Sequence, residues 1–230
     1  GVHLQTGQLA APPGLFHSPA RHTRARKCYN RAARLTERGR GLTEEKVTRL
    51  EQITEERLAK LERVRALGLS PYPNRFPRSH TGAEAIQLLE TEEAAGQLGQ
   101  ATLTLAGRVT ARRGMGKLAF LDLRDGSARI QLMVQKNVLS EAAVAILEDL
   151  DIGDFIGASG TLSRTRTGEP TLMAADLTLL AKSLLPLPEK WHGLTDIDIR
   201  HRQRYLDLIA NPAVKDAFEL RSRIISATRR

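Results

Sequence analysis

Cysteine and long apolar runs are scarce in this sequence, and each scarcity excludes a class of protein. The 230 residues contain one cysteine, Cys28, so no internal disulfide framework and no cysteine zinc site can form. No apolar run approaches the roughly 18 residues of a membrane-spanning helix. The histidines lack metal-ligand spacing, and no glycine-rich phosphate loop, carboxylate cluster or activated nucleophile occurs. We therefore expect no cofactor or metal within this chain, and no membrane partner.

The net charge of +9 is concentrated near the start of the chain. Residues 21–40 contain eight lysines or arginines and one acid, whereas residues 100–185 contain ten basic and nine acidic residues. Residues 1–42 have no sustained period, and we expect them to form a disordered basic tail. A solvated extension, an organelle transit segment and a nonspecific RNA-binding arm all remain open as roles for it.

Five short segments of alternating apolar and polar residues predict a β-barrel. The expected strands are residues 102–112, 117–124, 128–135, 154–163 and 171–180. Gly114 and Gly116 mark the first turn, and residues 140–150 have helical spacing with Ser140 as the expected N-cap. Five strands with a helix between the third and the fourth are the order of the all-β OB-fold, a Greek-key barrel that commonly binds oligonucleotides.

Helices are expected on both sides of the barrel. Residues 43–67 carry an apolar stripe that ends at Gly68, and residues 83–93 predict a second short helix. We expect the first helix to pack against the barrel or against a second subunit. After a proline-containing linker, residues 200–209 and the segment that begins at Pro212 predict two further helices.

The second and third expected strands predict an open binding face. Alternation places Phe120 opposite the apolar row of its own strand, and Arg129 and Gln131 on the same side of the next strand. An aromatic ring beside an amide and an arginine suits an unpaired nucleobase, because stacking contributes roughly 1–3 kcal/mol per base. Alternatively, a loop or the N-terminal segment covers Phe120. The local cations available to hold RNA are Arg108, Arg112, Arg113 and Lys117 near the first turn, and Arg164 and Arg166 near the last.

Several separated motifs resemble those of class II lysyl-tRNA synthetases. They are residues 63–76 with LGLSPYPNRF, 112–117 (RRGMGK), 190–196 (KWHGLTD), 200–209 (RHRQRYLDLI) and 218–230. The resemblance covers roughly residues 43–230, and the motifs keep their order. Aspartyl- and asparaginyl-tRNA synthetases share the barrel and the Arg-Tyr-Leu-Asp element. The Trp-His-Gly-Leu segment and the pair Gln203 and Arg204 favour the lysine enzymes.

The resemblance implies that the barrel reads the tRNA anticodon. It implies that Phe120 stacks on the central uridine and that Gln131 and Glu169 hydrogen-bond it. The carboxylate would accept from the uracil N3–H or, if protonated, donate to a carbonyl. The resemblance also makes Arg108, Arg112 and Lys117 candidates for backbone or base contacts, beside Arg129.

The resemblance further implies a domain order. It consists of a basic tail (1–42), an N-terminal helical extension (43–99), the anticodon-binding OB-fold (100–183), a linker (184–199) and the truncated start of an α/β class II catalytic domain (200–230). The full-length family enzyme uses ATP and Mg²⁺ to attach lysine to tRNA(Lys), and it is expected to be a cytoplasmic homodimer, or organellar if the tail is a transit segment. Since this chain lacks the ATP and lysine site, we expect it to be inactive alone.

Two other functions remain open at this stage. One is a standalone OB-fold module that binds single-stranded nucleic acid, which predicts sequence-tolerant binding with a steep salt dependence. The other is a noncatalytic scaffold that dimerises through its terminal helices.

Overall fold

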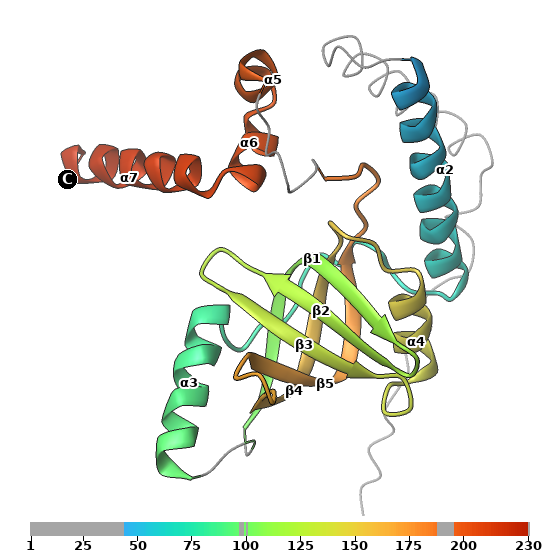
Figure 1. Cartoon of the computed structure of the whole chain (residues 1–230), viewed down its shortest axis with the longest axis vertical. Helices are drawn as coiled ribbons and strands as arrows, with labels where there is room; N and C mark the ends of the chain where they lie inside the picture. Colours follow the sequence, from blue (N-terminus) through green and yellow to red (C-terminus); the bar gives the residue numbers. More distant parts are fainter. Residues whose placement is uncertain (1–43, 97–98, 100, 188–195, 230) are drawn as a thin grey trace, which may run out of the picture. The chain divides into compact units, whose positions relative to one another are not determined.

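The computed structural model describes residues 44–96, 99, 101–187 and 196–229 (Figure 1). The prediction of a disordered tail over residues 1–42 lies outside the described residues, as does half of the linker expected over residues 184–199. None of the described helices is both long enough and apolar enough to cross a membrane.

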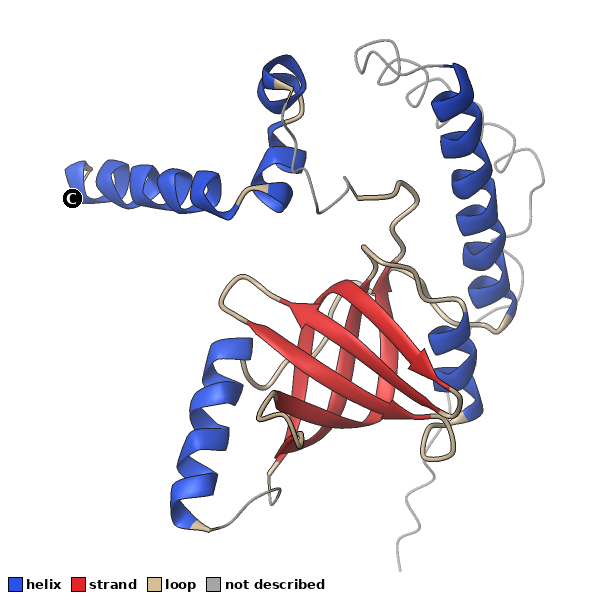
Figure 2. Cartoon of the chain, in the orientation of Figure 1, coloured by secondary structure: helices blue, strands red, loops and turns tan. Residues whose placement is uncertain are grey.

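Five strands close into a barrel in the order β1-β2-β3-β5-β4 (Figure 2). They are β1 (Thr102–Met115), β2 (Leu118–Arg124), β3 (Arg129–Gln135), β4 (Phe155–Arg164) and β5 (Pro170–Ala181). The pairing of β3 with β5 is parallel, and every other pairing in the barrel is antiparallel. Helix α4 (Glu141–Glu148) connects β3 to β4, and the Ser140 side chain caps it by accepting from the Ala143 N–H. The predicted OB-fold is therefore confirmed.

The barrel interior is filled by the apolar residues that alternate along each strand. Leu121, Leu132, Ile156 and Leu172 are fully buried, as the period of two predicts for strands with one face on a core. Burying each such side chain contributes about 1.5–3 kcal/mol. A Cβ on Gly160 would overlap the Met173 carbonyl, so only glycine lets β4 and β5 approach this closely.

A buried cluster of charges ties the end of β5 to the start of β4. The Lys182 ammonium lies 2.7 Å from Asp154 Oδ2 and 2.6 Å from Asp151 Oδ2, and both Lys182 and Asp154 are buried. Lys60 of helix α2 (Glu44–Ala66) also pairs with Asp151, at 2.5 Å. On the same helix, the Arg57 guanidinium donates to the backbone carbonyls of residues 152, 183 and 185. Helix α2 is thus anchored on the barrel, one of the two positions expected for it.

Helix α3 (Gly82–Ala95) is anchored on the turn between β2 and β3 through Asp125. This carboxylate accepts from the backbone N–H groups of Gly82, Ser127 and Ala128, at 2.8, 2.7 and 2.8 Å. Burial alone raises the pKa of Asp125, but these hydrogen bonds together outweigh it and lower the pKa to about 2. The start of the helix is also closed by a capping box between Thr81 and Glu84.

Three helices are described after residue 195: α5 (Ile197–Arg202), α6 (Arg204–Ala210) and α7 (Pro212–Thr228). The single helix predicted over residues 200–209 is divided, because the backbone of Gln203 leaves the helical region. Buried Asp207 holds the two halves together by accepting from the side chains of Arg200 and Asn211, at 2.8 and 2.6 Å, and from Arg204. The helix break is accompanied by ion pairs between side chains three and seven residues apart, which the apolar periodicity does not reveal.

The pKa of Asp125 predicts a specific loss of stability in acid. Its value of about 2 in the fold lies below the ordinary 3.8, so the carboxylate stabilises the protein above about pH 4, and this contribution is lost as the pH falls through about 2. Between about pH 5 and pH 2, the wild type should therefore lose more free energy of unfolding than Asp125→Asn, as measured by urea denaturation. Parallel pH profiles for the two proteins would contradict this role, and Glu62→Gln, which alters an exposed ion pair on α2, is the control.

Candidate nucleic-acid interface

Phe120 lies on the outer surface of the barrel, away from the apolar interior. In the strand register it faces Arg113 on β1 and Met133 on β3. Its ring is half-buried, whereas its neighbour Leu121 is fully buried inside the barrel. The barrel thus presents one aromatic ring between a guanidinium and a thioether on a surface that is open to a ligand.

The adjacent cross-strand row carries polar side chains. Asp122 faces Gln131 on β3, which faces Thr171 on β5. The Thr171 hydroxyl lies 3.2 Å from Gln131 Oε1, which orients the amide so that its NH₂ group is the free end. Phe120 and Gln131 are diagonal neighbours, a separation of about 7–8 Å in an antiparallel pair. A planar ligand on Phe120 would therefore have the Gln131 amide at its edge.

A chain of ion pairs crosses this face and brings in Glu169. Asp122 accepts from Arg113 at 3.3 Å and from Arg129 at 3.4 Å, and Arg129 also contacts Glu169 Oε2 at 3.4 Å. These distances are long for hydrogen bonds between charged groups, and the arginine and glutamate side chains are solvent-exposed. Such pairs contribute little stability and can be exchanged for contacts with a ligand.

The turn that carries Glu169 is held by contacts from outside the face. Arg164 makes a bidentate pair with Glu93 of α3 at 2.6 and 2.7 Å, and it donates to the Gly168 carbonyl at 2.8 Å. The hydrogen bond between the two side chains raises the pKa of Arg164 and lowers the pKa of Glu93. The Glu169 N–H also donates to the Thr165 hydroxyl. These contacts fix the backbone of the turn from which the Glu169 side chain projects.

A β-bulge in β1 decides which arginine reaches Phe120. Val109 faces Leu123 and Ala111 faces Asp122, so one extra residue, Thr110, is inserted in β1. Beyond the bulge the faces are exchanged: Arg113 faces Phe120, while Arg112 faces the buried residue Leu121 and donates to the Leu150 carbonyl at 2.6 Å. The sequence predicts both arginines as cations able to hold RNA, but it makes only Arg112 a candidate for backbone or base contacts. Asp122 is not among the predicted site residues, because nothing in the residue types marks the bulge.

The other two predicted cations lie away from the ring. Arg108 faces Arg124 on β2 and Phe155 on β4, at the other end of the outer surface. Lys117 is exposed in the turn between β1 and β2. The structure thus makes Gln131 a diagonal neighbour of Phe120, and it links Glu169 to the same face through Arg129 and Thr171. Within the described part of the chain, Arg108, Arg112 and Lys117 make no hydrogen bond or ion pair with these residues.

This face is suited to binding a planar ligand. It offers a ring for stacking, an amide and a guanidinium as donors, and two carboxylates as acceptors. Within the described part of the chain, no three His, Cys, Asp or Glu side chains are grouped closely enough to hold a metal ion.

Residues 103–180 match the family model of the OB-fold nucleic acid binding domain, of the tRNA anticodon type. The matched residues run from the start of β1 to the end of β5, so the anticodon-type OB-fold domain contains the whole surface around Phe120.

The similarity to known proteins extends well beyond this anticodon-type domain. The chain is 51% identical over 179 residues to a lysine--tRNA ligase of Dehalococcoides mccartyi, an alignment of 78% of this chain and 36% of the relative. Lysine--tRNA ligases of Carboxydothermus hydrogenoformans and Anaeromyxobacter are each 45% identical, over 78% and 82% of this chain and 36% and 37% of the relatives. The resemblance to lysyl-tRNA synthetases is confirmed, and the chain spans about a third of the length of the curated relatives it matches.

The bulge predicts opposite consequences for two adjacent arginines. Arg112→Ala leaves the buried carbonyl of Leu150 without its donor, so it should lower the free energy of unfolding by about 1–2 kcal/mol. Arg113→Ala removes a long, exposed ion pair and should change the free energy of unfolding by less than about 0.5 kcal/mol. Urea denaturation of both variants checks this, and equal effects would show that the faces of β1 are not exchanged.

Proposed function

We propose that this chain is the tRNA anticodon-binding part of a lysine--tRNA ligase. The observation that carries the proposal is the surface of Phe120, Gln131 and Glu169 within an OB-fold of the anticodon-binding type. The high identity to lysine--tRNA ligases supports it. A standalone single-strand-binding module is not favoured, because the similarity to these enzymes covers 179 residues and therefore extends beyond the 103–180 domain.

In this proposal, the central uridine of the anticodon leaves the loop and stacks on Phe120. Uracil presents an N3–H donor between two carbonyl acceptors, so it needs one acceptor and at least one donor from the protein. The Glu169 carboxylate accepts from N3–H, and the free NH₂ of Gln131 donates to a carbonyl. Cytosine has an acceptor at N3, which would face the carboxylate without a proton between them. Readout of the central base is thus a matching of donors to acceptors.

The surrounding cations have a different role in the proposal. Arg113 and Arg129 flank the face and would bind the phosphates on either side of the stacked base. Arg112 and Lys117, the other candidates from the sequence, would act at the periphery, Lys117 from the turn between β1 and β2.

We assign lysine activation to the rest of the enzyme. The domain order proposed is a basic tail (1–42), a helical extension (43–99), the anticodon-binding barrel (100–183), a linker (184–199) and the start of the catalytic domain (200–230). The sequence has no motif for binding ATP or Mg²⁺, and no described His, Cys, Asp or Glu side chains are grouped to hold a metal ion. We therefore assign no catalytic step to the described residues. The full-length enzyme would act on tRNA(Lys) as a homodimer, in the cytoplasm or in an organelle.

Phe120→Ala should weaken binding of an anticodon stem-loop that contains a central uridine. Loss of one base-stacking platform costs roughly 1–3 kcal/mol, or about fivefold to 150-fold in affinity. Fluorescence anisotropy with a labelled stem-loop measures the change, and thermal melting should show that the barrel remains folded. Val138→Ala, which truncates an exposed apolar side chain outside the face, is the matched control. Unchanged affinity for Phe120→Ala would refute the stacking role.

Glu169→Gln should reduce discrimination between bases more than it reduces affinity. The glutamine amide can donate as well as accept, so the variant should tolerate a central cytosine that the carboxylate rejects. We expect the ratio of dissociation constants for central cytosine and central uridine to fall by about tenfold, the value of one charged hydrogen bond. Glu148→Gln, which alters an exposed ion pair with Lys136, is the control. Equal losses for all four central bases would exclude base readout by Glu169.

A further inference from the structure

A row of basic side chains continues from the Phe120 surface toward the opposite end of the barrel. The register aligns Arg129 on β3, Arg124 on β2 and Arg108 on β1, and the row ends at Phe155 on β4. Adjacent members are direct cross-strand partners, so all of them stand on the outer surface. Arg129 also contacts Asp122 and Glu169, and it therefore belongs both to this row and to the face around Phe120.

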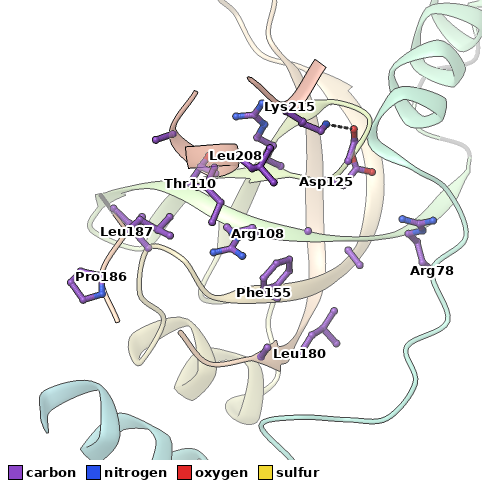
Figure 3. Close-up of a pocket in the computed structure, with 18 of the residues that line it drawn as sticks. Arg78, Arg108, Thr110, Asp125, Phe155, Leu180, Pro186, Leu187, Leu208 and Lys215 are labelled. Atoms are coloured by element: carbon purple, nitrogen blue, oxygen red, sulfur yellow. Dashed lines mark hydrogen bonds between the residues drawn. The ribbon is translucent and has the colours of Figure 1, made fainter. Parts of the chain in front are cut away.

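The Arg108 side chain is held in place by an aromatic ring rather than by an acid. Its guanidinium carbon lies 4.4 Å from the centre of the Phe155 ring (Figure 3). Burial lowers the pKa of Arg108, which means that its charge is incompletely hydrated. Within the described residues, neither Arg108 nor Arg124 has an acidic partner. A fixed, partly desolvated and uncompensated guanidinium is an arrangement that binding of an external anion stabilises.

The surroundings of Arg108 form a cavity with a strong excess of positive charge. The cavity has a volume of about 1,100 Å³ (Figure 3). Its cationic lining residues are Arg57, Arg78, Arg108, Arg124 and Lys215. Asp125 is the only acidic residue among the described residues that line it, and both of its oxygens already accept backbone N–H groups. Among the described lining residues, no carboxylate is therefore left to neutralise Arg108 and Arg124.

We propose that Arg129, Arg124 and Arg108 form a phosphate track that binds the RNA backbone on one side of the base stacked on Phe120. This inference rests on the proposed function. Phe120 and Arg124 are four residues apart on β2, about 13 Å along the strand, which is too far for both to contact the same base. A guanidinium binds phosphate through paired N–H donors. Because the Arg108 guanidinium lies over the Phe155 ring, its N–H groups remain available to donate to a phosphate.

The phosphate track contributes affinity without reading sequence. Phosphates are the same at every nucleotide, so Arg108 and Arg124, which have no contact with Glu169, strengthen binding equally for all anticodons. Each phosphate contact also adds to the salt dependence of binding, because the RNA releases counterions. Stacking on Phe120 releases no counterion, and the two contributions can therefore be separated by a salt titration.

The test uses this chain with labelled anticodon stem-loops of central uridine and central cytosine. Dissociation constants are measured by fluorescence anisotropy over a series of KCl concentrations for the wild type, the double variant Arg108→Gln/Arg124→Gln, and Phe120→Ala. The double variant should weaken binding of both RNAs by the same factor and reduce the slope of log K against log salt by about two. Phe120→Ala should weaken binding and leave the slope unchanged.

Two further variants make the result specific to the track. Arg65→Gln removes an exposed arginine on α2 and should leave affinity and slope unchanged. Arg108→Lys keeps the charge and should keep the slope, which separates loss of a phosphate contact from misfolding. An unchanged slope in the double variant overturns the phosphate track. If Phe120→Ala still weakens binding of the stem-loop, the proposed function stands without the track. If Phe120→Ala has no effect while the double variant loses its slope, the track holds and the anticodon proposal fails.

Discussion

One inserted residue in β1 determines which side chains a ligand can meet. A period of two counted from Arg108 places Arg112 outside the barrel, but the bulge at Thr110 moves Arg113 there instead. Arg112 is then free to donate to the Leu150 carbonyl and supports the end of the barrel. Because a shift of one residue exchanges the two faces of a strand, the bulge separates a structural arginine from one that faces the ligand surface.

The charged groups of this protein fall into two physical classes. Lys182 and Asp154 are buried, form an ion pair at 2.7 Å and make further hydrogen bonds. Separating them would leave an unpaired charge in the interior. Arg129 pairs at 3.4 Å with two acids in contact with solvent and loses little when it changes partner. The buried pair therefore holds the ends of β4 and β5 together, while the long exposed pairs of Arg129 keep the ligand surface ready to rearrange.

Most of the fold could be predicted from the sequence because the strands and helices follow local patterns of apolar and capping residues. Alternation gave the strands around Leu121 and Leu132, and Ser140 gave the start of α4. The position of Phe120 outside the core followed from the same alternation. The bulge at Thr110 could not be predicted from the apolar pattern, because it is defined by the pairing of β1 with β2. The helix break at Gln203 could not be predicted either, because it accompanies ion pairs of polar side chains that carry no periodic signal. Glu169 entered through family resemblance alone, because a charged turn residue carries no periodic signal.

The position of Arg129 couples the two proposed functions of the surface. In the free protein, Arg129 contacts the Glu169 carboxylate, which the proposal assigns to the base. Arg129 is also the first arginine of the phosphate track. A phosphate that draws Arg129 away would release Glu169 to accept from uracil N3–H, so backbone binding would prepare base readout. Because such coupling is reciprocal, a base that satisfies Glu169 would in turn favour Arg129 on the phosphate. Discrimination between bases would then depend on a contact that does not itself read sequence.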